Sequence, residues 1–252
     1  MRIDILTLFP DVIAAATAQS ILKRARDAGL ADIRAVDLRP YGQGRHRITD
    51  DTPVGGGGGM LMKVEPIAEA LDDLAVGGKP DRVILTDPRG KRFTQALARE
   101  LACLRRLVFI CGHYEGVDER VRSELATDAV SIGDYVLTGG ELPALVMADA
   151  VVRLVPGVLG AEDAPGRDSF AEPLLEYPQY TRPRVYRGRA VPDILFTGDH
   201  ARIERWRRWR QLHTTRQQRP DLWEQFEPSP EDLRLLDAAE PDAAPSALGE
   251  TK

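Results

Sequence analysis

Glycine-bearing turns at the ends of predicted strands are where this sequence is best suited to bind a ligand. Four such segments occur: Thr86–Gly90, Cys111–Gly116, Ser131–Glu141 and the five-glycine run Gly55–Gly59. In an open α/β sheet, ligands bind beyond the carboxyl ends of the strands. These four segments are therefore the candidate ligand-binding loops.

The segment Ser131–Glu141 favours a functional interpretation. It is too irregular for a strand and too apolar for a solvated loop. Buried irregular backbone needs partners for its N–H and C=O groups, and a bound heterocycle supplies them. The segment Cys111–Gly116 places Tyr114 and Glu115 between two glycines, although a tight strand-to-helix turn capped by Asp118 explains it equally simply.

The run Gly55–Gly59 is conspicuous but unspecific. It lacks the GxGxxG spacing of a dinucleotide-binding turn and the following Lys-Ser/Thr of a phosphate-binding loop. Its composition favours a flexible surface loop. The preceding residues Arg45–Arg47 and Asp50-Asp51 form a polar cluster suited to meet a ligand or another chain.

Two charged side chains, Arg153 and Asp168, are candidates for charge stabilisation and proton transfer. Arg153 follows Asp149 by four residues, so an ion pair within one helix explains both residues. Asp168 ends a segment rich in glycine and proline, where an aspartate usually caps a helix or is solvated. Without other information, the structural interpretation is the simpler one for each residue.

The elements that position these residues alternate between strands and helices. The expected strands are Ile3–Phe9, Ile33–Leu38, Arg82–Thr86, Arg106–Cys111 and Ala129–Ile132. The expected helices are 10–29, Val64–Leu74, Thr94–Leu104, Asp118–Leu125 and Leu142–Val155. This order predicts an α/β fold with a mostly parallel sheet covered on both faces. The last helix is apolar nearly all round and too short to span a bilayer, which predicts a place in the core or in a subunit interface.

A change of composition divides the chain. Residues 156–173 are rich in glycine, proline and acids and predict a flexible connector. The predicted units are a domain over 1–160, a connector over 161–170, a basic helical domain over 171–236 and a disordered tail over 237–252. Asp199 is the expected N-cap of a basic helix that carries Ile203, Trp206 and Leu212 on one side.

Charge is distributed unevenly along a chain whose net charge is −5. Residues 181–219 hold 11 arginines against Asp193, Asp199 and Glu204, whereas 221–252 hold nine acids against two basic residues. A basic block inside an acidic protein suits a polyanionic partner. A solvated charged helix explains the block about as well.

Length and composition exclude several classes of protein. A chain of 252 residues with 43% hydrophobic residues can bury one large or two modest cores. Cys103 and Cys111 form no CxxC pair and the four histidines are scattered, which argues against a disulfide framework and a structural zinc site. No apolar run approaches the ~18 residues of a membrane span, and the N-terminus does not resemble a signal peptide. A cytoplasmic location is expected.

A long set of motifs occurs in a fixed order over nearly the whole chain, up to about residue 236. They are Ile5–Pro10, Arg45–Arg47, Asp50-Asp51, Gly55–Met62, Gly112–Arg120, Ser131–Pro143, Val155–Gly160, Asp168–Phe170, Tyr180–Pro183, Val191-Pro192 and Gly198–His200. With these motifs the chain resembles the bacterial tRNA (guanine-N1)-methyltransferase family, within the SPOUT superfamily of knotted methyltransferases. A linear set of this length is far more specific than any single motif.

The resemblance implies a mostly parallel α/β domain with a deep trefoil knot at its C-terminal end, a small and mainly helical C-terminal domain, and S-adenosyl-L-methionine as the methyl donor. Three loops would hold this cofactor in the knot. The matching residues are Leu85, Thr86, Pro88, Gly90, Gly112, Tyr114, Glu115, Gly116, Ile132, Gly133, Asp134, Tyr135, Val136, Leu137, Gly139, Gly140 and Pro143.

The resemblance also implies a reaction, methylation of N1 of guanosine 37, which lies 3′ of the anticodon in tRNA. Asp168 matches the general base and Arg153 the residue that stabilises charge on O6, while Glu115 would lie near the methionine end of the cofactor. Family members also respond to Mg²⁺, although no metal-ligand spacing is visible here. The arginines expected to contact tRNA are Arg182, Arg184, Arg202, Arg205 and Arg208.

The family further implies a homodimer whose active site lies at the subunit interface, with the segments 45–62 and 142–155 as candidate contributors. The chain departs from many relatives at His113, where they carry arginine, and at Asp87 and Arg89 in a variable loop. Two other interpretations are a non-catalytic tRNA-binding protein on the same scaffold and a Rossmann-type nucleotide enzyme. The missing GxGxxG disfavours the latter.

Overall fold

A computed structural model describes residues 1–160, 166 and 168–241 of the chain. By its internal contacts the chain separates into two compact units, Met1–Glu162 and Asp163–Lys252. Each unit has its own hydrophobic core. Within the described residues, no helix has the length and apolar character needed to cross a membrane.

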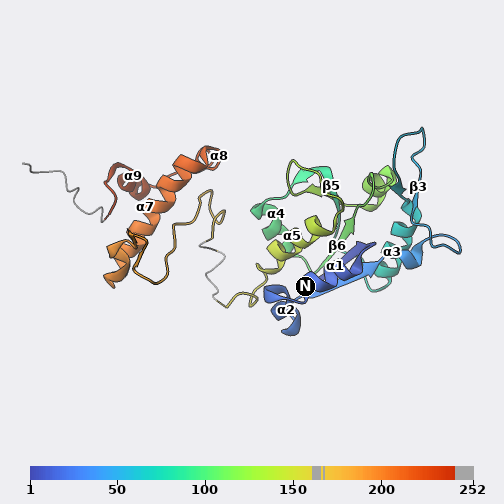
Figure 1. Cartoon of the computed structure of the whole chain (residues 1–252), viewed down its shortest axis with the longest axis horizontal. Coiled ribbons are helices and arrows are strands. Elements are labelled where there is room, and N and C mark those ends of the chain that lie inside the picture. Colours follow the sequence, from blue (N-terminus) through green and yellow to red (C-terminus); the bar gives the residue numbers. More distant parts are fainter. Residues whose placement is uncertain (161–165, 167, 242–252) are drawn as a thin grey trace, which may run out of the picture. The chain divides into compact units, whose positions relative to one another are not determined.

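Unit 1 is built on a parallel sheet of five strands in the order β2-β1-β6-β5-β7 (Figure 1). The strands are β1 (Arg2–Thr7), β2 (Asp32–Asp37), β5 (Arg82–Arg92), β6 (Arg106–Cys111) and β7 (Asp128–Ser131). All six residues of β6 are buried, since helices cover both faces of the sheet. The prediction of an α/β fold with a mostly parallel sheet is confirmed.

Two apolar clusters lie on the two faces of this sheet. On one face, Phe109 packs with α1 (Pro10–Thr17), α2 (Ser20–Asp27), α4 (Gln95–Ala102) and α5 (Glu141–Val152). On the other face, Val108 and Ile110 pack against α3 (Val64–Val76) and a π-helical turn over Val121–Leu125. The alternation of side chains along β6 therefore supplies both cores.

Two helices predicted for unit 1 differ from those in the structure. The helix expected over 10–29 is two helices, because Ser20 adopts a left-handed φ of 51° and turns the chain. The helix expected over Asp118–Leu125 begins at residue 119 and is mostly the π-helical turn Val121–Leu125. Asp118 precedes it, and its carboxylate accepts hydrogen bonds from the side chain and backbone N–H of Arg120, as expected of a cap; these bonds lower its pKa to about 2.

The strand β5 continues beyond its expected end at Thr86. Both Thr86 and Lys91 pair with Val130 of β7, so residues 87–90 leave the ladder and the strand then resumes. An excursion of this kind re-aims side chains next to a site. It places the segment 87–90 at the carboxyl ends of the central strands.

The glycine run of unit 1 is more ordered at its base than its composition predicts. The short strands β3 (Asp50–Asp51) and β4 (Leu61–Met62) pair in antiparallel fashion on either side of it. Met62 also bridges to Val117, next to the second candidate loop. Only the middle of the run, around Gly55, Gly56 and Gly58, has open space around it.

Unit 2 is a small helical unit with one hairpin. Its elements are β8 (Val185–Tyr186), β9 (Arg189–Ala190), a 3₁₀ turn (Asp193–Phe196), α7 (His200–Gln218), α8 (Pro220–Trp223) and α9 (Pro230–Asp237). Asp199 caps α7 by accepting a hydrogen bond from the backbone N–H of Arg202, as expected. The expected inward face of α7 is confirmed, because Ile203, Trp206 and Leu212 are buried.

The tail predicted to be disordered from residue 237 has contacts at its start. The indole N–H of Trp209 donates to the carbonyl of Ala238, and that of Trp206 donates to the carboxylate of Glu240. The ordered part of unit 2 thus extends at least to Glu240. Residues 242–252 lie outside the described part.

Candidate cofactor site

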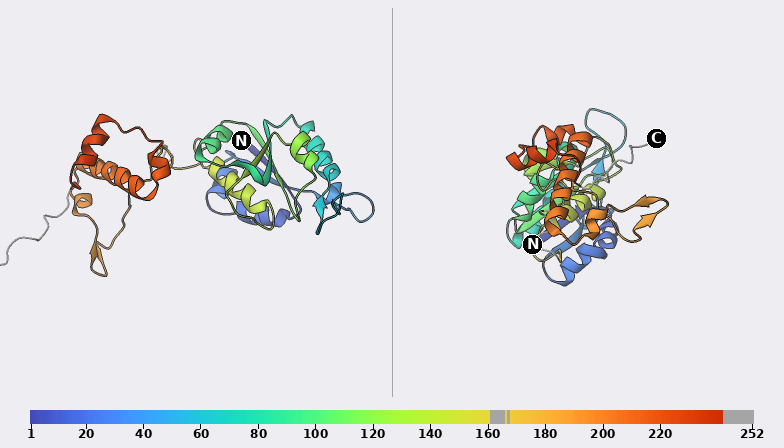
Figure 2. Two further views of the ribbon diagram at one scale, coloured as in Figure 1. Left: turned by 90° about the horizontal axis from the view of Figure 1, so that it is seen from above. Right: turned by 90° about the vertical axis from the view of Figure 1, so that its left-hand side faces the viewer.

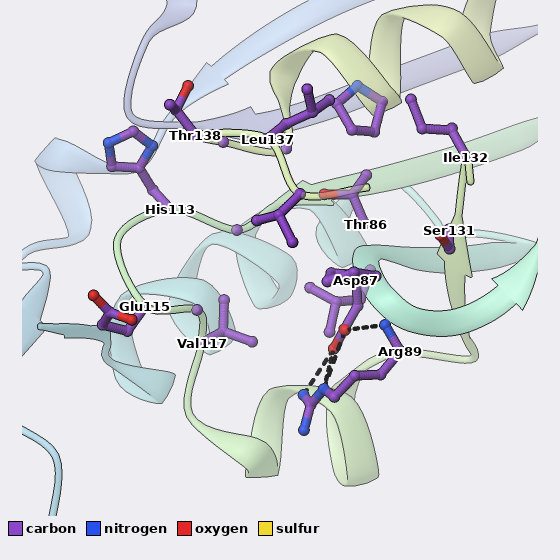
Figure 3. A pocket seen from close by; sticks show the side chains of 18 of the residues that line it. Thr86, Asp87, Arg89, His113, Glu115, Val117, Ser131, Ile132, Leu137 and Thr138 are labelled. Atoms are coloured by element: carbon purple, nitrogen blue, oxygen red, sulfur yellow. Dashed lines mark hydrogen bonds and ion pairs between the residues drawn. The ribbon is translucent and has the colours of Figure 1, made fainter. Parts of the chain in front are cut away.

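A cavity of about 550 Å³ lies in unit 1 where the carboxyl ends of β5, β6 and β7 meet (Figure 3). Its walls come from the three predicted loops. Fifteen of the seventeen residues expected to bind the cofactor line it: Leu85, Thr86, Pro88, Gly112, Tyr114, Glu115, Gly116, Ile132, Gly133, Tyr135, Val136, Leu137, Gly139, Gly140 and Pro143. A cavity of this size accommodates a nucleoside-sized ligand.

Close backbone contact holds two of these loops together. The N–H of Gly140 donates to the carbonyl of Gly112 at 2.8 Å, and Gly139 bridges to His113. A Cβ on Gly140 would stand 2.7 Å from Cα of Cys111. Position 140 therefore admits only glycine at this distance, which is how a loop from β6 and a loop from β7 form one wall.

The loop between β7 and α5 supplies most of the apolar wall. Tyr135, Val136 and Leu137 line the cavity although 56%, 84% and 39% of their surfaces are exposed. Gly133, at a φ of 151°, leaves room for the ring of Tyr135 beside it. Exposed apolar side chains around a concave cavity provide a surface for a flat, weakly polar ring.

Charged groups gather on one side of the cavity. The guanidinium of Arg89 donates to Asp87 at 2.7 Å (Figure 3). It also donates to Glu119 at 3.1 Å. Burial by itself would raise the pKa of Asp87, but the hydrogen bonds from the side chain and backbone N–H of Arg89 outweigh it and lower the pKa. Asp87 is therefore an anion at neutral pH, and Arg89 compensates two carboxylates.

The glycine run reaches this cavity at Glu115. The N–H of Glu115 donates to the carbonyl of Met60, and the N–H of Met62 donates to the carbonyl of Gly116. A Cβ on Gly59 would stand 2.6 Å from Oε1 of Glu115, so the end of the run packs directly on this side chain. The run thus orients the carboxylate expected beside the methionine end of the cofactor.

Two predicted cofactor residues do not line the cavity. Gly90 packs against the backbone of Ala129 and Val130, where a side chain would not fit. Asp134 points into solvent, with 93% of its side chain exposed, and pairs with Arg92 at 3.3 Å. Gly90 therefore shapes the excursion in β5, and Asp134 neutralises a surface arginine.

The two predicted catalytic residues belong to different units. Arg153 is half-buried and ends α5, where its N–H donates to the carbonyl of Asp149 at 3.1 Å. Asp168 lies in unit 2 and lines a second cavity of about 200 Å³ together with Arg207, Arg208 and Gln211.

Asp168 belongs to a segment that is fixed to α7. The carbonyl of Asp168 accepts from the N–H of Ala171, and the hydroxyl of Ser169 accepts from the N–H of Glu176. The N–H of Leu175 donates to the hydroxyl of the fully buried Thr215 at 2.8 Å. Asp168 is therefore part of the fold of unit 2. Of the predicted connector, 161–165 and 167 lie outside the described residues.

Comparison with known proteins identifies the chain. A sequence model of the family described as tRNA (guanine-1)-methyltransferase TrmD matches residues 1–225. The chain belongs to this family. The tRNA (guanine-N(1)-)-methyltransferase of Moorella thermoacetica is 54% identical over 239 residues, which are 94% of this chain and 96% of that protein. The enzyme of the same name from Geobacillus kaustophilus is 53% identical and covers 90% of this chain and 93% of its own.

The fold agrees with a solved structure of the family. The crystal structure of tRNA (m1G37) methyltransferase from Aquifex aeolicus is similar with a TM-score of 0.73 and 40% identity, covering 89% of this chain and 95% of that one. The predicted family and fold class are thereby confirmed. The trefoil knot that the family implies stays a prediction.

The structure divides the predicted RNA-contacting arginines of this methyltransferase into two groups. Arg208 is held inside unit 2 by Asp232 at 2.7 Å and by Glu172 at 3.0 Å. Arg184 pairs with Asp193 at 2.9 Å. Arg182, Arg184, Arg202 and Arg205 are all exposed, and their contact with RNA phosphates stays a prediction.

Sequence reasoning missed part of the cavity wall. Asp87 and Arg89 of the predicted loop Thr86–Gly90 line it together with Glu119, although none of the three was among the residues expected to bind the cofactor. The position of Asp87 directly after the buried run of β5 was the available signal, whereas the pairing with Glu119, thirty residues from Arg89, has no local signature. Among the described residues, no cluster of three histidines, cysteines or acids is arranged to hold a metal ion.

Proposed function

We propose that this methyltransferase transfers a methyl group from S-adenosyl-L-methionine to N1 of guanosine 37 in tRNA, and that it acts in the cytoplasm. The observation that carries the proposal is the convergence of fifteen family-matched residues on one cavity of about 550 Å³. The described residues suit the cofactor, because an apolar wall, irregular backbone and the carboxylate of Glu115 face the same space. The cofactor supplies an activated methyl group on a sulfonium.

The chain's own residues then have to handle one proton and one developing charge. N1 of neutral guanine carries a proton and is a poor nucleophile until that proton leaves. Asp168 accepts the N1 proton as the new N–CH₃ bond forms, and the electron pair of the broken bond stays on the donor sulfur. Arg153 donates hydrogen bonds to O6, where negative charge accumulates.

A homodimer is part of this proposal. Val12 on α1 and Leu142 and Val146 on α5 are about half exposed, although half of the residues of α5 are buried. The helices α1 and α5 contact each other, so these apolar side chains lie on one region of unit 1. An exposed apolar region of this kind marks an interface, and a second copy of the chain would bring the unit 2 of one subunit to the cavity of the other.

The test of the reaction is incubation of the enzyme with unmodified tRNA and a labelled methyl donor, followed by nucleoside mapping. We expect labelled 1-methylguanosine from position 37 alone. The competing non-catalytic interpretation is tested by calorimetry with S-adenosylhomocysteine, which the cavity is expected to bind. Absence of heat and of labelled nucleoside would favour a protein that only binds tRNA.

A pair of arginines separates RNA contact from structural support. Arg205 is exposed, so Arg205→Ala is expected to raise the KM for tRNA and to leave the stability of the protein unchanged. The slope of the logarithm of the binding constant against the logarithm of the salt concentration should fall in magnitude by about one unit. Arg208→Ala is expected to cost about 1–3 kcal/mol of unfolding free energy, because it removes the cation beside the buried Asp232 and leaves this carboxylate with only the hydrogen bonds from Ser229.

The pH dependence of unfolding checks this assignment of Arg208. Hydrogen bonds from Arg208 are the main cause of the lowered pKa of Asp232. The stabilisation is therefore fully present above the ordinary aspartate pKa and is lost as the pH falls through the lowered value. Denaturation at a series of pH values should show that the difference in unfolding free energy between the native protein and Arg208→Ala becomes smaller in acid. An equal difference at every pH would contradict the assignment.

A further inference from the structure

The hairpin of unit 2 projects away from the helices α7, α8 and α9 (Figure 2). Val185 pairs with Ala190 and Tyr186 with Arg189, while Arg187 and Gly188 form the turn with φ values of 49° and 77°. Positive φ at both turn residues is the two-residue geometry that matches the twist of paired strands. All residues from 181 to 190 are exposed.

One face of this hairpin combines an aromatic ring with two guanidinium groups. Successive side chains of a strand point to opposite faces, so the paired residues Tyr186 and Arg189 share a face and Val185 lies on the other. The guanidinium of Arg187 lies 5.2 Å from the centre of the Tyr186 ring. Tyr186 keeps 61% of its surface exposed, so the other side of the ring is open to a partner.

Most of the positive charge of the hairpin is not compensated by acids in the part of the chain that the structure describes. Residues 182–189 contain four arginines and no acid. Arg184 pairs with Asp193, but Arg182, Arg187 and Arg189 form no ion pair with any part of the chain that the structure describes. By contrast, Arg207, Arg208 and Arg210 of α7 are each paired with a carboxylate. The hairpin therefore carries cations that are available to an anionic partner.

The base of the hairpin makes contacts with the 3₁₀ turn that follows it. The N–H of Val191 donates to the carbonyl of Arg184 at 2.8 Å, and Val191 is buried. The guanidinium of Arg184 lies 4.6 Å from the ring centre of Phe196 and binds Asp193. A tyrosine side chain has only two rotatable torsions, so it loses little conformational entropy when a flat group stacks on its ring.

An open aromatic ring flanked by arginines suits an unpaired nucleotide. Unstacked RNA bases bind by stacking on aromatic rings, and arginine binds the neighbouring phosphates with its planar fork of donors. A duplex hides the faces of its bases and offers only phosphates. We propose that the hairpin face of Tyr186, Arg187 and Arg189 holds an unpaired nucleotide of the RNA substrate, with the base on Tyr186 and the flanking phosphates on the two arginines. The proposal rests on the proposed function, in which unit 2 binds tRNA.

Binding of tRNA by the full-length protein tests the proposal, measured for variants of both kinds of contact. Tyr186→Ala is expected to weaken binding by about tenfold, the usual loss for one stacked base, and Tyr186→Phe to retain it. Arg187→Ala and Arg189→Ala should each lower the salt slope by about one unit, whereas Tyr186→Ala should leave the slope unchanged. Val185→Thr, on the opposite face, is the matched control and should bind like the native protein.

Two RNA probes distinguish stacking of an unpaired base from contact with phosphates. A stem-loop oligonucleotide should show the loss in Tyr186→Ala, and a blunt duplex of equal length should not. Equal binding by the native protein and Tyr186→Ala would overturn the hairpin proposal and leave the proposed function intact. An equal loss on both probes would also overturn it. Failure of the native protein to bind tRNA at all would refute the proposed function and the hairpin proposal together.

Discussion

Asp168→Asn is expected to lower the rate of methyl transfer by about a hundredfold to ten-thousandfold, the usual contribution of a positioned general base. Asparagine keeps the size and hydrogen-bonding capacity of the side chain but cannot accept the N1 proton. Binding of S-adenosylhomocysteine should be unchanged, because Asp168 belongs to unit 2 and is not among the residues lining the cofactor cavity of unit 1. Single-turnover measurements with labelled donor would report the rate, and calorimetry the binding.

Glu172→Gln is the matched control for this experiment. Glu172 lines the same small cavity as Asp168 and stands four residues away on the segment fixed to α7. The substitution removes one negative charge, as Asp168→Asn does, but the side chain of Glu172 pairs with Arg208. We expect this variant to retain near-native turnover. Near-native turnover in Asp168→Asn would remove Asp168 from the mechanism, and an equal loss in both variants would indicate a structural effect of charge.

Gly140→Ala is expected to abolish binding of the cofactor. The new Cβ would stand 2.7 Å from Cα of Cys111 and 2.8 Å from the N atom of Gly112, and backbone atoms on a buried strand end have no room to move. The loops after β6 and β7 would have to separate, which breaks the cavity wall that both form. Overpacking of this kind also costs about 1–3 kcal/mol of unfolding free energy.

Gly58→Ala is the control for Gly140→Ala. Gly58 lies in the glycine run, has no atom within 4 Å of an added Cβ and does not need a left-handed φ. The thermal midpoint of the Gly58→Ala variant and its affinity for S-adenosylhomocysteine should match those of the native protein. If Gly140→Ala bound S-adenosylhomocysteine with native affinity, the contact between the two loops would not be needed for the site.

The two proposed catalytic groups belong to different units of the chain. Arg153 ends a helix of unit 1, and Asp168 is tied to α7 of unit 2 through Leu175 and the buried Thr215. The proposed base therefore belongs to the same unit as the basic block. We expect correct docking of tRNA on unit 2 to be a condition for proton transfer, since that docking positions Asp168.

Sequence patterns predicted the secondary structure where the signal is local. The strand Arg106–Cys111 was predicted with its observed ends, and Asp199 was predicted as the cap of α7. Both depend on a few neighbouring residues, namely an apolar run and a side-chain oxygen next to free N–H groups. Resemblance to a family added the cofactor residues, of which fifteen line one cavity.

Tertiary structure alone decided which of these residues act together. The excursion of residues 87–90 depends on the pairing of both Thr86 and Lys91 with Val130, and the wall at Gly140 depends on its contact with Gly112. Arg208 and Arg189 are both arginines of the basic block, yet Arg208 is paired inside unit 2 and Arg189 is exposed on the hairpin. Local sequence carries capping, periodicity and turn signals, whereas close contacts and ion pairs join residues that only folding brings together.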